Sequence, residues 1–215
     1  MLTISVVNAK GGCGKSTLTT NIASYFSAMG LRVGIADFDP QGSSMAWLRY
    51  RGDQYTPIQS VPVEGQLAKP VSELDVLVLD APAGLVGEHL TALLQQSVKI
   101  VIPVLPSSID IRAVGHFLYE ILQQDESVLS EVEMAVVANR VKKNTLSYAV
   151  LEKFLKKLSI PFVTSLRDSQ HYVQAAAAGA GLFDLPANQT EEDLKQWKPL
   201  INWLMKRPDF IPLTD

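Results

Sequence analysis

A glycine-rich segment between an apolar run and a helical pattern constrains this 215-residue chain more than any other feature. It reads Lys-Gly-Gly-Cys-Gly-Lys-Ser-Thr over residues 10–17. Glycines let backbone N–H groups turn inward around phosphates, and the N-terminus of the helix that follows adds positive potential. Because the eight residues and both flanking elements agree, the segment predicts a loop that binds the phosphates of a nucleotide.

The side chains of this loop have separate expected tasks. Lys15 is expected on the β- and γ-phosphates, Ser16 would ligate Mg²⁺ through its hydroxyl, and Thr17 would contact the α-phosphate. Cys13 is expected to act through its backbone N–H. A redox role for its thiol is the alternative, because helix N-termini lower thiol pKa values. The predicted nucleotide-binding residues of the loop are Gly11, Gly12, Cys13, Gly14, Lys15, Ser16 and Thr17.

Short apolar runs alternate with helical patterns along the whole chain. Most of the runs are apolar on both faces, as parallel strands covered by helices are. The alternation predicts one α/β domain over residues 1–215, doubly wound, with a mostly parallel sheet and helices on both faces. We expect no separate helix-turn-helix domain. The predicted strands are Leu2–Val7, Arg32–Asp37, Asp75–Asp80, Lys99–Leu105, Glu133–Asn139 and Pro161–Ser165.

Apolar residues at helical spacing predict the helices between these strands. One helix is expected to follow the glycine loop and stop at Gly30, and another is expected around 114–122. A third would start at Asn144 and face the core with one stripe. That stripe consists of Leu146, Val150, Phe154, Leu155 and Leu158.

The C-terminal stretch Glu191–Lys206 predicts a helix that is interrupted or restarted at Pro199, since proline suits a first turn. Its apolar side is expected to dock on the core. A membrane-seeking face is the alternative.

Composition excludes several classes of protein. With 47% hydrophobic residues the chain can bury a substantial core, so disorder and disulfide scaffolds are poor interpretations. No window reaches the roughly 18 uncharged apolar residues of a membrane span, and no secretion signal is recognisable. The single cysteine cannot form an internal disulfide, which fits a cytoplasmic protein. The net charge of −3 means that any nucleic-acid role needs a local basic patch.

Lys10, five residues before Lys15, goes beyond a standard phosphate loop. The pair is the signature of deviant Walker A ATPases, and the chain resembles the ParA/MinD family of P-loop NTPases from Leu2 to about Lys206. The resemblance implies ATP and Mg²⁺ as ligands and a homodimer that sandwiches ATP. It also implies that Lys10 reaches across the interface to the partner's nucleotide, where a cation would offset charge developing on the phosphates. An exposed, solvated lysine is the alternative.

Two acidic segments follow predicted strands. Asp37 and Asp39 lie in Asp-Phe-Asp-Pro-Gln-Gly-Ser, and Asp80 ends an apolar run, as in a Walker B element. Carboxylates at strand ends face the crevice where open α/β sheets bind ligands. The resemblance implies that Asp39 orients the attacking water, that Asp37 supports the Mg²⁺ shell and that Asp80 holds Mg²⁺. It therefore gives Lys10, Lys15 and Asp39 as catalytic residues and Ser16, Asp37 and Asp80 as metal-site residues.

Asn139 ends the fifth predicted strand. The family places an adenine-contacting asparagine there, and an amide can both donate to and accept from the adenine edge. An Asx turn at the end of the strand remains the alternative.

A basic cluster lies within residues 140–157, where Glu152 is the only acidic residue. Such a surface could bind DNA phosphates without reading bases, although a merely solvated helix face is the alternative. Arg167 is expected to extend it. The candidate DNA-binding residues are Arg140, Lys142, Lys143, Lys153, Lys156, Lys157 and Arg167.

The branches of the family can be partly separated. An iron–sulfur member would need a cysteine pair, and a MinD-like protein would carry a lysine-rich amphipathic helix at its extreme C-terminus. The tail 208–215 contains two prolines and predicts no such helix.

The sequence therefore resembles a small ParA-type (ParF-like) ATPase. That resemblance implies a cytoplasmic, nucleoid-associated dimer that binds DNA non-specifically and partitions or positions a plasmid, a chromosome or a protein compartment. A cargo-bound, ParB-like adaptor would stimulate hydrolysis, with no insertion into a membrane. Two alternatives remain open: a membrane-associated positioning ATPase like MinD, and a P-loop enzyme that phosphorylates or ligates a small molecule.

Overall fold

Seven parallel strands form the central sheet of the computed structural model, which describes residues 1–69, 71 and 73–206. Their spatial order is β3-β2-β6-β1-β7-β8-β9, and every pairing between neighbours is parallel. The strands are β1 (Leu2–Val6), β2 (Val33–Asp37), β3 (Ile58–Ser60), β6 (Val76–Asp80), β7 (Lys99–Val104), β8 (Glu133–Val141) and β9 (Phe162–Arg167).

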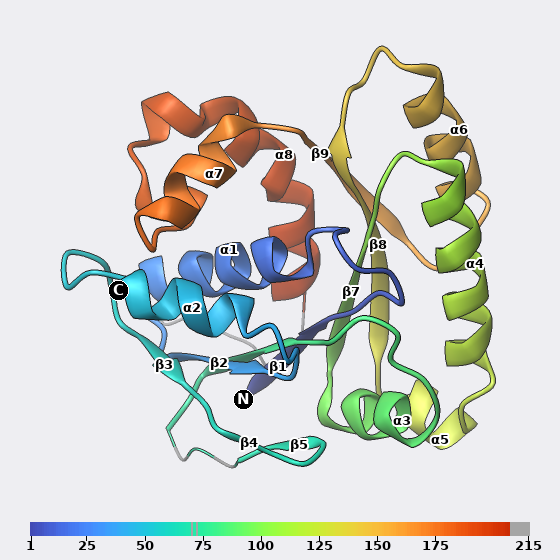
Figure 1. Ribbon diagram of the computed structural model, residues 1–215, viewed down its shortest axis with the longest axis horizontal. Helices are drawn as coiled ribbons and strands as arrows, with labels where there is room; N and C mark the ends of the chain where they lie inside the picture. The colour runs from blue at the N-terminus through green and yellow to red at the C-terminus, as the bar shows by residue number, and fades with distance from the viewer. Residues whose placement is uncertain (70, 72, 207–215) are drawn as a thin grey trace.

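Helices cover both faces of this sheet (Figure 1). On one face α1 packs over β1, β2 and β6 and α8 packs against β9. On the other face α3 packs over β1, α4 over β7 and α6 over β8. The doubly wound α/β fold is thus confirmed. The helices are α1 (Lys15–Ala28), α2 (Ser43–Tyr50), α3 (Gly87–Gln96), α4 (Ser108–Leu122), α5 (Glu126–Leu129), α6 (Leu146–Leu155), α7 (Gln170–Ala177), the 3₁₀ helix η1 (Leu182–Asp184) and α8 (Ala187–Met205).

All six predicted strands are present, with ends that differ by at most two residues. The sequence reasoning missed β3 at the sheet edge and the small antiparallel hairpin of β4 (Val63–Glu64) and β5 (Leu67–Ala68). Each has only two or three residues, and in β3 only Ile58 is buried. Segments this short carry no periodicity that could reveal them.

The C-terminal helix differs from the prediction because α8 runs without a break through Pro199. Trp197, Leu200 and Leu204 on its apolar side are fully buried against the core. This packing outweighs the hydrogen bond that a proline inside a helix lacks. The docked interpretation is confirmed over the membrane-seeking one for α8, whereas the prediction about the tail 208–215 lies outside the described residues.

The core-facing stripe predicted for α6 was wrong in part. Leu151 and Leu155 are fully buried, but Leu146 is 82% exposed and Val150 49% exposed. Adjacent residues of a helix point about 100° apart, so a core contact through Leu151 turns Val150 away from the sheet. Two apolar side chains therefore lie on the outer surface of α6.

A buried ion pair ties α2 to the segment before α8. The Arg51 guanidinium donates two hydrogen bonds to Asp184, at 2.8 and 3.0 Å, and both side chains are only 4% exposed. Ser24 of α1 donates to the same carboxylate at 2.8 Å. Arg51 also stacks on the ring of Trp47, 5.3 Å from its centroid.

We expect Arg51→Ala to lower the free energy of unfolding by about 3 kcal/mol, because it leaves the Asp184 carboxylate buried without its cation. For a domain of this size, that corresponds to a fall in Tm of about 6–12 °C in thermal denaturation followed by circular dichroism. Arg49→Ala, on the exposed side of the same helix, is the control and should change Tm by less than about 2 °C. Equal shifts in the two variants would contradict this assignment.

Candidate nucleotide-binding site

The glycine loop connects β1 to α1, and its conformation depends on left-handed glycines. Gly12 has φ +77° and Gly14 has φ +95°, values that favour glycine over residues with a side chain. Gly14 is also the N-cap of α1, and a Cβ there would come within 2.3 Å of the Asn139 amide nitrogen. The loop is therefore built around two positions where an ordinary side chain would be strained.

Lys15 is almost fully buried at the start of α1. Its ammonium donates to the backbone carbonyl of Lys10 at 3.2 Å and lies 3.5 Å from that of Asn8. The loop thus curls around the Lys15 ammonium, which places its charge at the centre of the predicted phosphate site. No contact with a phosphate is needed to hold this lysine in place.

Asn139 holds the loop from the side of β8. Its amide nitrogen donates to the Cys13 carbonyl at 2.8 Å, and its amide oxygen accepts from the backbone N–H of Arg140 at 3.0 Å. Both functions of the amide are thus used within the chain. The contact of Asn139 with adenine stays a prediction. The sequence analysis missed that Asn139 also helps to hold the glycine loop.

The thiol of Cys13 is buried and lies 3.3 Å from the Lys10 carbonyl. Burial raises the pKa of this thiol, and the nearby charge of Lys15 only partly offsets that effect. A redox role requires an accessible thiolate, so the geometry favours the interpretation in which Cys13 acts through its backbone.

Lys10 is partly exposed and forms an ion pair within this subunit. Its ammonium lies 2.8 Å from Oδ2 of Asp110, a carboxylate that is only 2% exposed in the first turn of α4. The Ser107 hydroxyl donates to the same oxygen. Asp110 was not among the residues that the sequence analysis singled out. The signal that could have found it is an acidic residue three positions after a serine N-cap.

Asp37 and Asp80 lie side by side, because β2 and β6 pair in parallel with these two residues in register. Asp37 is surrounded by donors: its Oδ2 accepts from the Ser44 hydroxyl at 2.7 Å, and its Oδ1 accepts from the backbone N–H of Asp39 at 3.0 Å. Asp39 in turn accepts from the N–H of Gln41 at 2.9 Å. Asp37 therefore anchors the loop that carries Asp39.

Asp80 has the opposite environment. It is fully buried, and neither carboxylate oxygen has a hydrogen bond of normal geometry among the described residues. Desolvation raises the pKa of Asp80 to about 7, with the charge of Asp37 adding to the rise. The Ser16 and Ser44 hydroxyls and the charge of Lys15 lower this pKa, but by less.

Two unsatisfied carboxylate oxygens beside the Ser16 hydroxyl fit Mg²⁺, a hard cation that takes oxygen ligands and keeps several waters. Within residues 1–69, 71 and 73–206, no three acidic, histidine or cysteine side chains form a ready-made metal cage. Mg²⁺ that binds together with nucleotide phosphates needs only one or two protein ligands. The donor set therefore suits a shared metal site rather than a permanent one.

The candidate DNA-binding residues divide into two groups. Lys142, Lys143, Lys153 and Lys157 are exposed and form no ion pair within the part of the chain that the structure describes. Lys156 pairs with Glu152 at 3.3 Å on α6. The face is thus largely free to meet an external anion.

The two arginines are more constrained than these lysines. Arg140, with φ +50° at an irregularity of β8, pairs with Asp168 at 3.3 Å. Arg167 donates to Asp193 through Nε at 2.6 Å and through a second nitrogen at 3.1 Å, and its third nitrogen meets Glu192. All of its donor nitrogens are thus engaged with α8. Its proposed contact with DNA stays a prediction that this geometry disfavours.

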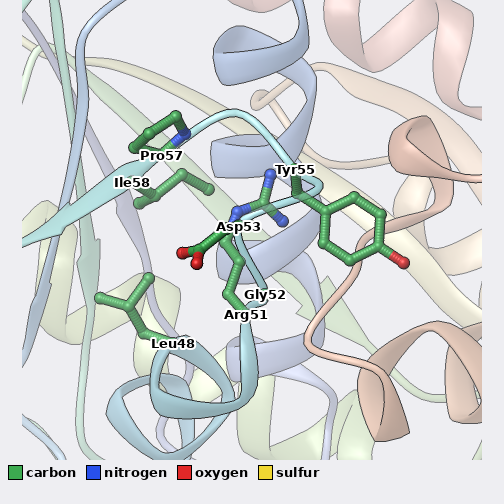
Figure 2. A pocket seen from close by; sticks show the side chains of 7 residues that line it. All are labelled: Leu48, Arg51, Gly52, Asp53, Tyr55, Pro57 and Ile58. Atoms are coloured by element: carbon green, nitrogen blue, oxygen red, sulfur yellow. The ribbon is translucent and has the colours of Figure 1, made fainter.

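A surface pocket of about 260 Å³ lies away from the phosphate loop, where α2 leads into β3 (Figure 2). The guanidinium in it belongs to Arg51, which is already paired with Asp184. The pocket therefore offers no free cation for a phosphate. Its lining residues are Leu48, Arg51, Gly52, Asp53, Tyr55, Pro57 and Ile58.

Comparison with known proteins agrees with this geometry. Residues 4–182 match the CobQ/CobB/MinD/ParA nucleotide binding domain. The chain is 31% identical over 194 residues to maintenance of carboxysome distribution protein A from Halothiobacillus neapolitanus, covering 86% of this chain and 88% of that protein. It is 40% identical over 76 residues to the chromosome-partitioning ATPase Soj from Thermus thermophilus, covering 34% and 30%.

Solved structures show the same fold. A plasmid partition protein from Borrelia burgdorferi bound to AMPPNP aligns with a TM-score of 0.73 at 16% identity, over 94% of this chain and 99% of that one. MinD from Aquifex aeolicus aligns with a TM-score of 0.72 at 19% identity over the full length of both chains.

The fold and the site thus define a P-loop nucleotide-binding protein with a second lysine in its phosphate loop. The chain belongs to the CobQ/CobB/MinD/ParA family, and its relatives include positioning ATPases of the ParA/MinD type. None of the helices in the described ranges is both long and apolar enough to cross a bilayer.

Asp80→Asn should stabilise the nucleotide-free protein by about 2 kcal/mol at pH 8, because it removes an uncompensated buried charge. The pKa of Asp80 is about 7 when folded and about 3.9 when unfolded, so the folded state holds the extra proton between these values. This carboxyl therefore costs stability increasingly as pH rises from about 4 to about 7. The measurement is Tm against pH.

The gain from Asp80→Asn should vanish below about pH 4, where both states of wild type are protonated. The same variant should lose the extra stabilisation that Mg²⁺ adds to bound nucleotide. A variant that is less stable than wild type at pH 8 would contradict the assignment of an unpaired buried carboxylate.

Proposed function

We propose that this chain hydrolyses ATP with Mg²⁺ and uses the cycle to position a cargo on DNA. The observation that carries the proposal is the meeting of Lys15 and Asp80 at the carboxyl edge of the sheet, where the glycine loop that leaves β1 encloses the Lys15 ammonium and the buried Asp80 ends the neighbouring strand. Lys10 belongs to the same loop. Membership of a family with partition and carboxysome-distribution relatives supports it.

Each residue has a task in the proposed reaction. The Lys15 ammonium would leave the loop carbonyls for the β- and γ-phosphates of ATP. Ser16 and Asp80 would hold Mg²⁺, which neutralises charge on the phosphate oxygens when bound, and Asp37 would support that site from behind. Asp39 would orient the attacking water. Asn139 would contact the adenine in addition to the Cys13 carbonyl.

Dimerisation in this proposal requires Lys10 to change partners. In the single subunit its ammonium neutralises the buried Asp110, so reaching a second subunit's nucleotide means leaving that carboxylate. The triphosphate offers more negative charge than one carboxylate, which favours the exchange when ATP is bound. Lys10 would then offset the charge that develops on the phosphates during hydrolysis.

Lys10→Ala should abolish ATP-driven dimerisation and lower ATP turnover by at least about tenfold, because the cation that crosses the interface is lost. Asp39→Ala should trap an ATP-bound dimer, because the attacking water is no longer oriented. Light scattering coupled to size-exclusion chromatography, with ATP and with ADP, measures dimerisation of both variants, and phosphate release measures their ATP turnover. The Tm of each variant controls for loss of folding, since Lys10→Ala leaves the buried Asp110 carboxylate without its cation.

The sandwich mechanism is wrong for this protein if both variants dimerise and hydrolyse ATP like wild type. An ATP-independent dimer would instead favour the small-molecule ligase that other branches of the family suggest. Lys10 weighs against that alternative, since a ligase needs no cation supplied across an interface.

The outer surface of α6 and the loop before it would bind DNA. Lys142, Lys143, Lys153 and Lys157 present ammonium groups there that have no ion-pair partner among the described residues, with Lys156 and Arg140 beside them. Two such faces in a dimer could bind phosphates without reading sequence. The protein would then be cytoplasmic and associated with the nucleoid, and a cargo-bound ParB-like adaptor would stimulate hydrolysis and release. The carboxysome relative favours a protein compartment as cargo.

Reversing Lys153, Lys156 and Lys157 to glutamate should weaken ATP-dependent binding to a random-sequence duplex by at least about tenfold and flatten its dependence on salt. Fluorescence anisotropy at two salt concentrations, with ATP, with ADP and without nucleotide, measures both effects. The control reverses Lys195, Lys198 and Lys206 on and after α8, which changes the net charge equally. If both triple variants lose the same affinity for the duplex, the effect comes from net charge and not from this surface of α6.

A membrane-associated cycle like that of MinD is the second candidate, because Leu146 and Val150 lie exposed on the same surface as these lysines. Pelleting with anionic vesicles only in the presence of ATP, together with no binding to DNA, would favour it.

A further inference from the structure

Ser44 occupies a fully buried position in the first turn of α2, next to the two carboxylates at the ends of β2 and β6. Its hydroxyl donates to Oδ2 of Asp37 at 2.7 Å, and its backbone N–H donates to the same oxygen at 3.1 Å. The N–H of Met45 is a third donor, at 3.2 Å. One carboxylate oxygen therefore collects three donors from the start of one helix.

The other oxygen of Asp37 continues this chain of contacts toward Asp39. It accepts from the Asp39 backbone N–H at 3.0 Å, and the Asp39 side chain accepts from the Gln41 N–H at 2.9 Å. The Asp39 carbonyl accepts from the backbone N–H of Gly42 at 2.8 Å. The loop between β2 and α2 is thus held mainly through the Asp37 carboxylate, and the orientation of that carboxylate depends on Ser44.

We propose that Ser44 is a positioning residue for hydrolysis: through Asp37 it fixes the loop that places Asp39. The inference rests on the proposed function, because the task of Asp39 in the reaction belongs to it. Catalytic groups must be held within about 0.5 Å of their productive position. Loss of the Ser44 hydroxyl removes the shortest hydrogen bond to Asp37 Oδ2 and lets the loop that carries Asp39 move. The phosphate loop is not altered, so ATP turnover falls while nucleotide affinity does not.

The test compares Ser44→Ala, Ser44→Thr and Ser43→Ala. Ser43 is the matched control, since it is the preceding residue of the same helix and is exposed. We expect Ser44→Ala to lower kcat by about tenfold with KM for ATP and the Kd for Mg·ADP within about twofold of wild type. Ser44→Thr restores the hydroxyl and should recover most of kcat, and Ser43→Ala should behave like wild type.

A second readout does not depend on hydrolysis. Amide hydrogen exchange of nucleotide-free protein should be faster at Asp39 and Gln41 in Ser44→Ala, with the glycine loop and α1 unchanged. If Ser44→Ala does not fold, Ser44→Cys, which keeps the volume with a weaker donor, takes its place in both measurements.

Unchanged exchange at Asp39 together with unchanged kcat overturns the inference. So does a fall in kcat that Ser44→Thr fails to restore, or one accompanied by an equal rise in KM, because either result marks a general loss of structure. Wild-type protein that does not hydrolyse ATP refutes the proposed function instead, and exchange at Asp39 and Gln41 then still decides whether Ser44 positions this loop.

Discussion

Parallel pairing of β2, β6 and β1 in register is the interaction on which the rest of the structure depends. It brings Asp37 and Asp80 to adjacent positions at one edge of the sheet, beside the loop that leaves β1. Asp37 and Asp80, which are 43 positions apart in the chain, thereby become neighbours across two paired strands. A shift of one residue in the pairing of β2 with β6 would turn one carboxylate to the opposite face of the sheet and separate the pair.

Three other buried charges in the described residues have ionic partners, and Asp80 differs from them. Asp184 has Arg51, Asp110 has Lys10, and the buried ammonium of Lys99 lies 2.7 Å from Glu133. An unpaired buried charge costs several kcal/mol, so folding alone would not favour it. Burial of the Asp80 carboxylate therefore lowers the stability of the fold, and a bound cation can offset this loss. The stability of the protein is thus linked to occupancy of the site.

Much of this arrangement could be predicted from the sequence, because its signals are local. The glycine loop, the strand ends at Asp37 and Asp80, and the alternation of elements each follow from the spacing of neighbouring residues. The partners of these residues could not be predicted in that way. Asp110 is 100 positions from Lys10, and Asn139 is 126 positions from Cys13, and only the packed sheet brings them together.

Errors in the helices have a related cause. The direction in which α6 faces the core depends on which of two adjacent apolar residues, Val150 or Leu151, contacts the sheet, and the pattern fits both. Pro199 looks like a helix start by its chemistry, yet the burial of Trp197 and Leu200 keeps α8 continuous. In both cases tertiary packing overrides a local preference.

The exposed pair Leu146 and Val150 has a consequence for how copies of this protein behave toward one another. Two molecules that meet through these side chains must also bring Lys153 and Lys157 of both copies close together. At 0.01 M salt the repulsion between such ammonium groups extends about 30 Å, whereas at 0.15 M it is screened within about 8 Å. Low ionic strength thus keeps the molecules apart, and added salt removes the barrier that protects the apolar pair from self-association.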